Sequence, residues 1–126
     1  MIEHGDGQTT VEDLKKLVQK FCEERDWDQF HDIKELAIGL ATESAELLDI
    51  MRFKTPAQLS ELLRDERSRI RISEELADIA WMLLRFCQLH GFELATALGD
   101  KMKKNEVKYP VATSRGSNRK YNEPPS

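Results

Sequence analysis

The sequence predicts an all-α protein with an antiparallel four-helix-bundle-like fold and one short extra helix. Apolar residues recur at helical spacing in four long segments, which is the main signal for this fold class. Glycine and proline are few, at 6 and 4 residues, and runs of β-branched residues are scarce, so a sheet is not favoured. A length of 126 residues suits a single domain with a modest core.

The first half of the chain offers two helix starts. Thr10, with Asp13 three residues later, has the capping-box pattern and precedes an apolar pattern that predicts a helix to about residue 24. A polar connector with two aromatic residues follows. Asp32 offers a second N-cap, from which we expect a long helix to about Phe53.

The second half predicts three further helices. Thr55 as a cap and Pro56 at the first helical position indicate the short extra helix. The next long helix is expected to end at Gly91, since glycine tolerates the left-handed conformation that closes many helices. A fourth main helix then stops before Pro110.

These elements define the expected organisation of the chain. Residues 1–9 are expected to form a flexible arm, and residues 10–110 an all-α domain. Residues 111–126 form a basic tail with little apolar content, which we expect to be flexible unless it orders on a ligand or partner.

Charge, hydropathy and cysteine usage exclude several classes of protein. The formal net charge of -4 argues against a partner nucleic acid. No apolar run reaches the roughly 20 residues that span a bilayer, and the first ten residues lack the features of a signal peptide, so we expect no membrane association. Cys22 and Cys87 lack CxxC spacing, which favours two reduced thiols in a cytoplasmic protein.

Two pairs of carboxylates interrupt the apolar pattern of the long helices. Glu43 and Glu46 form the first pair, and Glu75 and Asp78 form the second at the same spacing. At about 100° per residue, each pair lies within or at the edge of the apolar stripe of its own helix. The neighbouring Glu74 points away from that stripe, so we expect it to be solvated or to act indirectly.

Carboxylates that face a core need a partner, because an unpaired buried charge costs several kcal/mol or takes up a proton. Arg71 and Arg85 are the nearest basic residues, and both lie only near the edges of the apolar faces. A metal ion is therefore the more economical partner. An all-oxygen donor set favours Mg²⁺, with Mn²⁺ as a substitute, over Zn²⁺.

A Mg²⁺ site with open coordination positions is suited to phosphate groups. Polar and cationic side chains for the outer phosphates follow one another in the fourth helix: Lys101, Lys104, Asn105, Lys108 and then Tyr109. Ring side chains that could contact a base are Trp27, Phe30, His31 and Phe53. Taken singly, a basic helix face is more often plain surface and an aromatic side chain more often core, so these patterns alone leave the roles open.

Five segments together resemble the MazG-like superfamily of all-α nucleoside triphosphate pyrophosphohydrolases, and most closely its dCTP pyrophosphatase branch. In chain order they are ERDWDQFH, ESAELLDIMRFK, EELADIAWMLL, KMKKNEVKYP and SRGSNRKY. The resemblance covers about residues 10–122.

The resemblance implies a Mg²⁺-dependent enzyme that cleaves between the α and β phosphates. The expected reaction converts dCTP, or 5-modified dCTP, and water to dCMP and diphosphate, a house-cleaning role in the nucleotide pool. It also implies a homo-oligomer, a tetramer built from dimers, with the pocket between subunits. The implied metal-binding and catalytic residues are Glu43, Glu46, Glu75 and Asp78. The implied substrate-binding residues are Trp27, Phe53, Lys101, Asn105, Lys108 and Tyr109, to which the connector adds His31.

Three alternatives stay open at the level of sequence. A di-iron carboxylate bundle would usually carry Glu-x-x-His motifs, and neither acidic pair contains histidine. A non-catalytic helical oligomerisation module could use the acidic pairs to bind arginines of a partner. A pyrophosphohydrolase with another or a broad nucleotide specificity would keep the same metal site.

Overall fold

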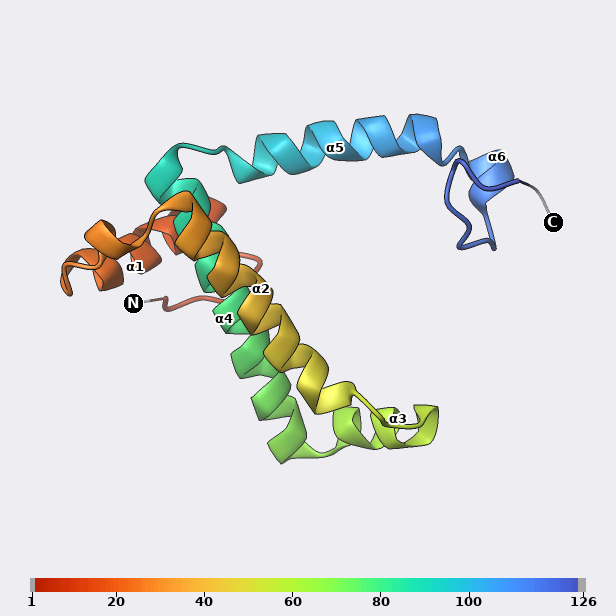
Figure 1. The fold of residues 1–126 in the computed structure, drawn as a ribbon, viewed down its shortest axis with the longest axis horizontal. Coiled ribbons are helices and arrows are strands. Elements are labelled where there is room, and N and C mark those ends of the chain that lie inside the picture. Colours follow the sequence, from red (N-terminus) through yellow and green to blue (C-terminus); the bar gives the residue numbers. More distant parts are fainter. Residues whose placement is uncertain (1, 125–126) are drawn as a thin grey trace. The chain divides into compact units, whose positions relative to one another are not determined.

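The computed structural model describes residues 2–124, which are helical apart from turns and loops (Figure 1). The predicted all-α class is confirmed, because no strand occurs among the described residues. The chain divides into two compact units, Met1–Phe92 and Glu93–Ser126, and each is described by itself. The elements are α1 (Val11–Glu23), the 3₁₀ turn η1 (Asp28–Phe30), α2 (Ile33–Met51), α3 (Pro56–Arg64), α4 (Glu66–His90), α5 (Leu94–Lys108) and α6 (Val111–Ser114).

The expected helix caps are present. Thr10 and Asp13 form a reciprocal capping box at the start of α1. The Asp32 carboxylate accepts a hydrogen bond from the Glu35 backbone N–H at the start of α2. Gly91 closes α4 in the left-handed conformation, with φ of 78°. Local side-chain chemistry therefore sets where these helices begin and end.

The first unit is built on α4, which packs against α1, α2 and α3. Figure 1 shows α2 and α4 side by side and antiparallel. Leu36, Ile50 and Leu84 are buried in this unit. Gly39 of α2 faces Met82 of α4 so closely that a Cβ at Gly39 would lie 2.7 Å from the Met82 Sδ. The absence of a side chain at Gly39 thus leaves room for the Met82 side chain, one turn from Glu43.

A buried lysine ties α1 to the end of α4. The Lys15 Nζ donates a hydrogen bond of 2.8 Å to the Phe92 carbonyl oxygen, just beyond Gly91. The pairing satisfies a charge that would otherwise be costly to bury.

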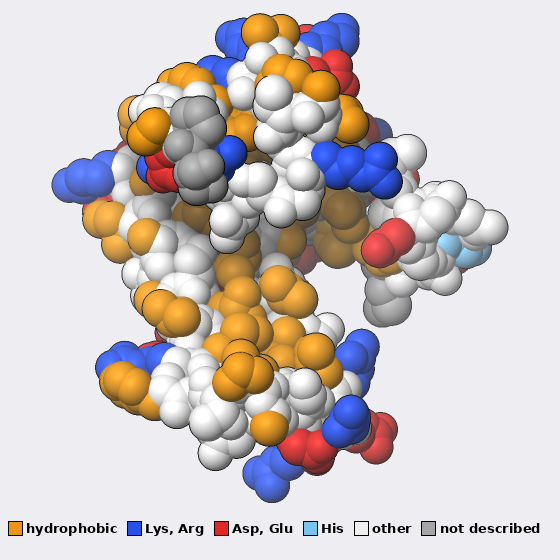
Figure 2. Space-filling model, turned by 90° about the vertical axis from the view of Figure 1, so that its right-hand side faces the viewer, with side chains coloured by type: hydrophobic (Ala, Val, Ile, Leu, Met, Phe, Trp, Pro, Cys, Tyr) orange, Lys and Arg blue, Asp and Glu red, His pale blue; other side chains and the backbone are white. Residues whose placement is uncertain are grey.

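Large apolar side chains remain exposed on the first unit. Figure 2 shows hydrophobic side chains gathered on the face in view, over the part of the molecule where α3 and the adjacent ends of α2 and α4 lie. The exposed set includes Leu48, Phe53, Leu63 and Ile70. Among the described residues, no helix is both long enough and apolar enough to cross a membrane.

The second unit contains α5 and the segment that follows it. Residues 111–124 form α6 and a looped segment with several turn hydrogen bonds. The Tyr109 and Tyr121 rings meet edge to face at 5.9 Å, and the Lys108 Nζ lies 4.9 Å from the centre of the Tyr121 ring. The predicted flexibility of this tail, the domain boundaries and the four-helix bundle stay predictions.

Candidate active site

The two acidic pairs come together between α2 and α4. One carboxylate oxygen from each of Glu43, Glu46, Glu75 and Asp78 lies within 4.8 Å of the others. The spacing of three residues puts both members of a pair on one helix face, and the antiparallel packing brings the two faces together. The expectation that the two pairs face one another is confirmed, while the roles of these residues stay predictions.

The cluster lacks protein partners for its negative charge. None of the ion pairs within residues 2–124 involves any of the four carboxylates. The Glu43 Oε2 and Glu75 Oε2 atoms are buried and accept no hydrogen bond from any described residue. Since buried polar atoms in folded proteins are almost always satisfied, these two oxygens fit the binding of a cation or a proton.

Mutual repulsion and burial favour the protonated forms of two of these groups. Burial raises the pKa of Glu43 to about 7, with further contributions from a hydrogen bond to Glu46 and from the negative charges of Glu46, Asp78 and Glu75. Burial also raises the pKa of Glu75, and the charge of Glu46 is the next largest cause. A divalent cation would remove this repulsion, and the oxygen-only donor set is the kind that hard cations prefer.

An apolar groove of about 480 Å³ adjoins the acidic cluster, because Asp78 contributes to both. Its remaining lining residues come from α1 and α4: Leu14, Leu17, Val18, Phe21, Ala77, Ala80, Trp81 and Leu84. An apolar slot beside a carboxylate cluster is the arrangement expected for a ligand with a flat apolar part and a charged end.

Trp27 packs beside this groove in an aromatic cluster that includes Trp81. The two indole rings stack with centroids 6.2 Å apart and planes inclined by 27°. Phe21 meets both rings edge to face, with centroids 5.7 Å from each. Trp81 is not among the predicted base-binding residues, although its position three residues after Asp78 places it on the same face of α4.

His31 lies in a polar cluster under the same connector. Its Nδ1 accepts a hydrogen bond of 3.1 Å from the Arg85 Nε, and its ring meets Trp27 edge to face at 6.2 Å. Arg85, placed near the edge of the apolar face by the helical pattern, is completely buried. Burial and the nearby positive charge of Arg85 lower the pKa of His31.

Phe53 lies at the opposite end of α2 from Trp27. It lies two residues beyond Met51, the last residue of α2, in a left-handed conformation with φ of 62°, and 90% of its surface is exposed. The 19 residues of α2 span about 28 Å at 1.5 Å per residue. One copy of the chain therefore cannot enclose a single base between Trp27 and Phe53.

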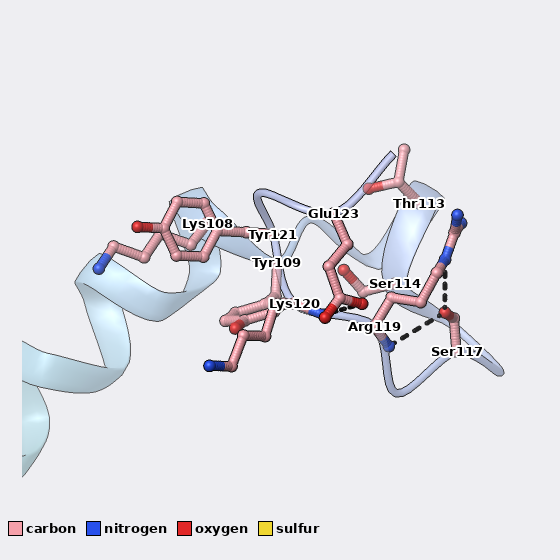
Figure 3. Close-up of a pocket in the computed structure, with 9 residues that line it drawn as sticks. All are labelled: Lys108, Tyr109, Thr113, Ser114, Ser117, Arg119, Lys120, Tyr121 and Glu123. Atoms are coloured by element: carbon pink, nitrogen blue, oxygen red, sulfur yellow. Dashed lines mark hydrogen bonds between the residues drawn. The ribbon is translucent and has the colours of Figure 1, made fainter. Parts of the chain in front are cut away.

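The remaining predicted substrate residues belong to the second unit. Lys101 and Asn105 lie on α5, exposed and half-buried respectively. Lys108 and Tyr109 line a pocket of about 400 Å³ whose other residues are Thr113, Ser114, Ser117, Arg119, Lys120, Tyr121 and Glu123 (Figure 3). The Arg119 Nε donates to the Ser117 Oγ over 3.3 Å in this pocket. The pocket thus gathers three cationic side chains, those of Lys108, Arg119 and Lys120, beside the Glu123 carboxylate.

Three comparisons with known proteins bear on this site. The model of the MazG-like family matches residues 38–123, a range that includes all four carboxylates. The proteins named dCTP pyrophosphatase 1 from Rattus norvegicus and Homo sapiens are each 34% identical over 118 residues, covering 94% of this chain and 69% of each relative. A solved pyrophosphatase from Archaeoglobus fulgidus has a TM-score of 0.74 and 33% identity, covering 87% of this chain and 99% of the other.

Proposed function

The chain belongs to the MazG-like family, and we propose that it is a nucleoside triphosphate diphosphatase that acts most readily on dCTP and 5-modified dCTP. Water adds to the α-phosphorus, the bond from that phosphorus to the oxygen bridging to the β-phosphate breaks, and the products are dCMP and diphosphate. The observation that carries this proposal is the cluster of four carboxylates, none of which forms an ion pair within residues 2–124. The names of the similar proteins support the choice of nucleotide.

Glu43, Glu46, Glu75 and Asp78 would hold Mg²⁺, or Mn²⁺ in its place, between α2 and α4. A cation bound there would neutralise phosphate charge and favour attack by water. Glu43 and Glu75, whose buried Oε2 atoms accept no hydrogen bond from the described residues, would give up their protons to hold it. Because all four side chains sit on rigid helices, the site is organised before substrate arrives.

Lys101, Asn105, Lys108 and Tyr109 bind the outer phosphates in this proposal. The ammonium group of Lys108 stabilises the charge that grows on the departing diphosphate, so it contributes more in the transition state than in the bound substrate. Arg119 and Lys120 lie in the same pocket as Lys108, which supports a role for the tail in phosphate binding.

Trp27 and the groove beside Asp78 receive the base, with Phe53 supplied by another copy of the chain. The length of α2 supports this division, since Trp27 and Phe53 lie at its opposite ends. The exposed apolar side chains near Phe53 support an interface between copies. We therefore propose a homo-oligomer, a tetramer built from dimers. We also propose a cytoplasmic location, because both cysteines are free and buried.

A nucleotide panel tests the proposal directly. Canonical and 5-modified nucleoside triphosphates are incubated with protein and Mg²⁺, and diphosphate, phosphate and nucleoside monophosphate are quantified. We expect diphosphate and dCMP in equal amounts from dCTP, and no turnover in EDTA. Turnover of many nucleotides at similar kcat/KM would indicate broad specificity. If no nucleotide is turned over in the presence of Mg²⁺, the proposal fails and the alternative of a non-catalytic helical oligomerisation module is favoured.

Replacing Trp27 tests the base-binding role. Stacking on an aromatic side chain contributes on the order of 1–3 kcal/mol, so Trp27→Ala should raise KM for dCTP about 5- to 150-fold, since 1.4 kcal/mol corresponds to tenfold. The Mg²⁺ requirement should not change. Phe92→Ala is the control, because Phe92 is an exposed aromatic residue of the same unit that does not line the groove. Equal KM values for the two variants would show that Trp27 does not contribute to binding of the base.

A further inference from the structure

Arg85 is a buried cation outside the acidic cluster, and the proposed reaction leaves it without a role. Its side chain is completely buried on α4. The Nε donates to the His31 Nδ1, one terminal nitrogen donates to the Gln88 side chain, and the other pairs with the Asp28 carboxylate. A buried guanidinium with three partners is costly to desolvate, and all its partners lie in two places, α4 and the connector before α2.

The partners of Arg85 in the connector flank the base-binding aromatic residue. Asp28 follows Trp27 directly, and His31 contacts the Trp27 ring. A second bond from α4 holds the same segment, since the His90 Nε2 donates to the His31 carbonyl oxygen over 2.8 Å. The segment itself is short and forms only one 3₁₀ turn, so these contacts from α4 fix its position.

The bond from Arg85 also determines the state of the His31 ring. A guanidinium N–H only donates, so the His31 Nδ1 must carry a lone pair. The ring is then neutral, with its proton on Nε2, and that N–H is a fixed donor. Asp28 and Arg85 are the charged groups that act on this ring, and the net result is a pKa below the usual value for histidine.

We propose that Arg85 is a positioning residue that holds the Trp27–His31 connector, and with it the Trp27 ring and the His31 Nε2–H, in the arrangement that receives the base. Arg85 itself does not contact substrate. This inference rests on the proposed function, because it assigns a purpose to the connector as one wall of the base site.

Histidine NMR on the wild-type chain tests the ring state without any enzyme assay. Long-range ¹H–¹⁵N spectra of the three histidines are recorded across pH 5–8 and assigned with His4→Gln and His90→Gln variants. We expect His31 in the neutral Nε2–H form at pH 7, with a pKa below about 6.5. An Nδ1–H form, or a pKa above that value, overturns the inference whether or not the variants below fold.

The kinetic test compares Arg85→Lys with Arg67→Lys, an exposed arginine on the same helix. Lysine keeps the charge but cannot bond to three partners at once. We expect KM for dCTP to rise about tenfold for Arg85→Lys, because about one good hydrogen bond is lost. The kcat should change less than about twofold, and the Mg²⁺ dependence should not change. Asp28→Asn, at a side chain that is 44% exposed, should raise KM in the same direction without unfolding the chain.

The outcomes separate this inference from the proposed function. A purely structural role predicts a lower Tm for Arg85→Lys with KM unchanged well below that temperature, which would overturn the inference. If dCTP is not a substrate but His31 shows the expected ring state, the proposed function fails, while the hold of Arg85 on the Trp27–His31 connector stands. If dCTP is hydrolysed and KM is unchanged in both Arg85→Lys and Asp28→Asn, only the inference fails.

Discussion

Replacing Asp78 with asparagine should stabilise the metal-free protein while removing its response to Mg²⁺. Two unit charges 4.8 Å apart, the largest separation in the cluster, repel by about 0.9 kcal/mol in a water-like dielectric. Asp78 takes part in three such pairs, so its neutralisation would relieve at least about 2.6 kcal/mol if all four groups were ionised. Proton uptake by Glu43, whose pKa is about 7, already relieves part of this repulsion. We therefore expect a gain of about 1–2 kcal/mol in the free energy of unfolding.

Thermal unfolding in EDTA and in Mg²⁺ measures this effect. For a chain of this size, a gain of about 1–2 kcal/mol raises Tm by roughly 3–10 °C. Mg²⁺ at 100 times its Kd should stabilise the wild type by about 2.7 kcal/mol and the variant far less.

Glu74→Gln is the matched control, since Glu74 is an exposed carboxylate on the same helix and outside the cluster. It should leave both the metal-free Tm and the Mg²⁺ response close to wild type. A lower metal-free Tm for Asp78→Asn, together with an unchanged Mg²⁺ response, would refute the reasoning.

Three further predictions concern pH, packing and the tail. The pKa of Glu43 is raised from 4.5 to about 7 in the folded, metal-free chain, so the folded state holds this proton more tightly than the unfolded state does. The free energy of unfolding should therefore fall as pH rises between these two pKa values. Denaturant titrations should show a weaker fall in Glu43→Gln. In a double-mutant cycle, Gly39→Ala should cost less free energy of unfolding in the Met82→Ala background than in the wild type, by about 0.5–1 kcal/mol, because the added Cβ meets the Sδ of a flexible side chain at 2.7 Å; additive changes would contradict this contact. Deletion of residues 113–126 should lower kcat for dCTP as Lys108→Ala does, and steady-state constants equal to wild type would exclude the tail from the site.

Local signals predicted the helices and the acidic cluster well. The caps at Thr10, Asp32 and Gly91 act within a few residues of the chain, so the sequence contains all that determines them. The meeting of the two acidic pairs follows from helical periodicity and from antiparallel packing of α2 and α4.

Long-range partners were beyond the sequence patterns. Arg85 lies near the edge of the apolar stripe, and only the fold brings it to Asp28, 57 positions away in the chain. The same holds for the stacking of Trp27 on Trp81, which depends on how the connector returns to α4. Periodicity describes one helix at a time, so it predicts which face is buried but not what that face meets.

Binding of Mn²⁺, followed by electron paramagnetic resonance and displaced by Mg²⁺, tests the central claim most directly. We expect the wild-type protein and Glu74→Gln to bind Mn²⁺ with similar affinity. We expect Asp78→Asn to lose at least about tenfold in affinity, or about 1.4 kcal/mol. Equal Mn²⁺ affinity in the wild type and Asp78→Asn, or no binding in the wild type, would contradict the assignment of the four carboxylates as a metal site.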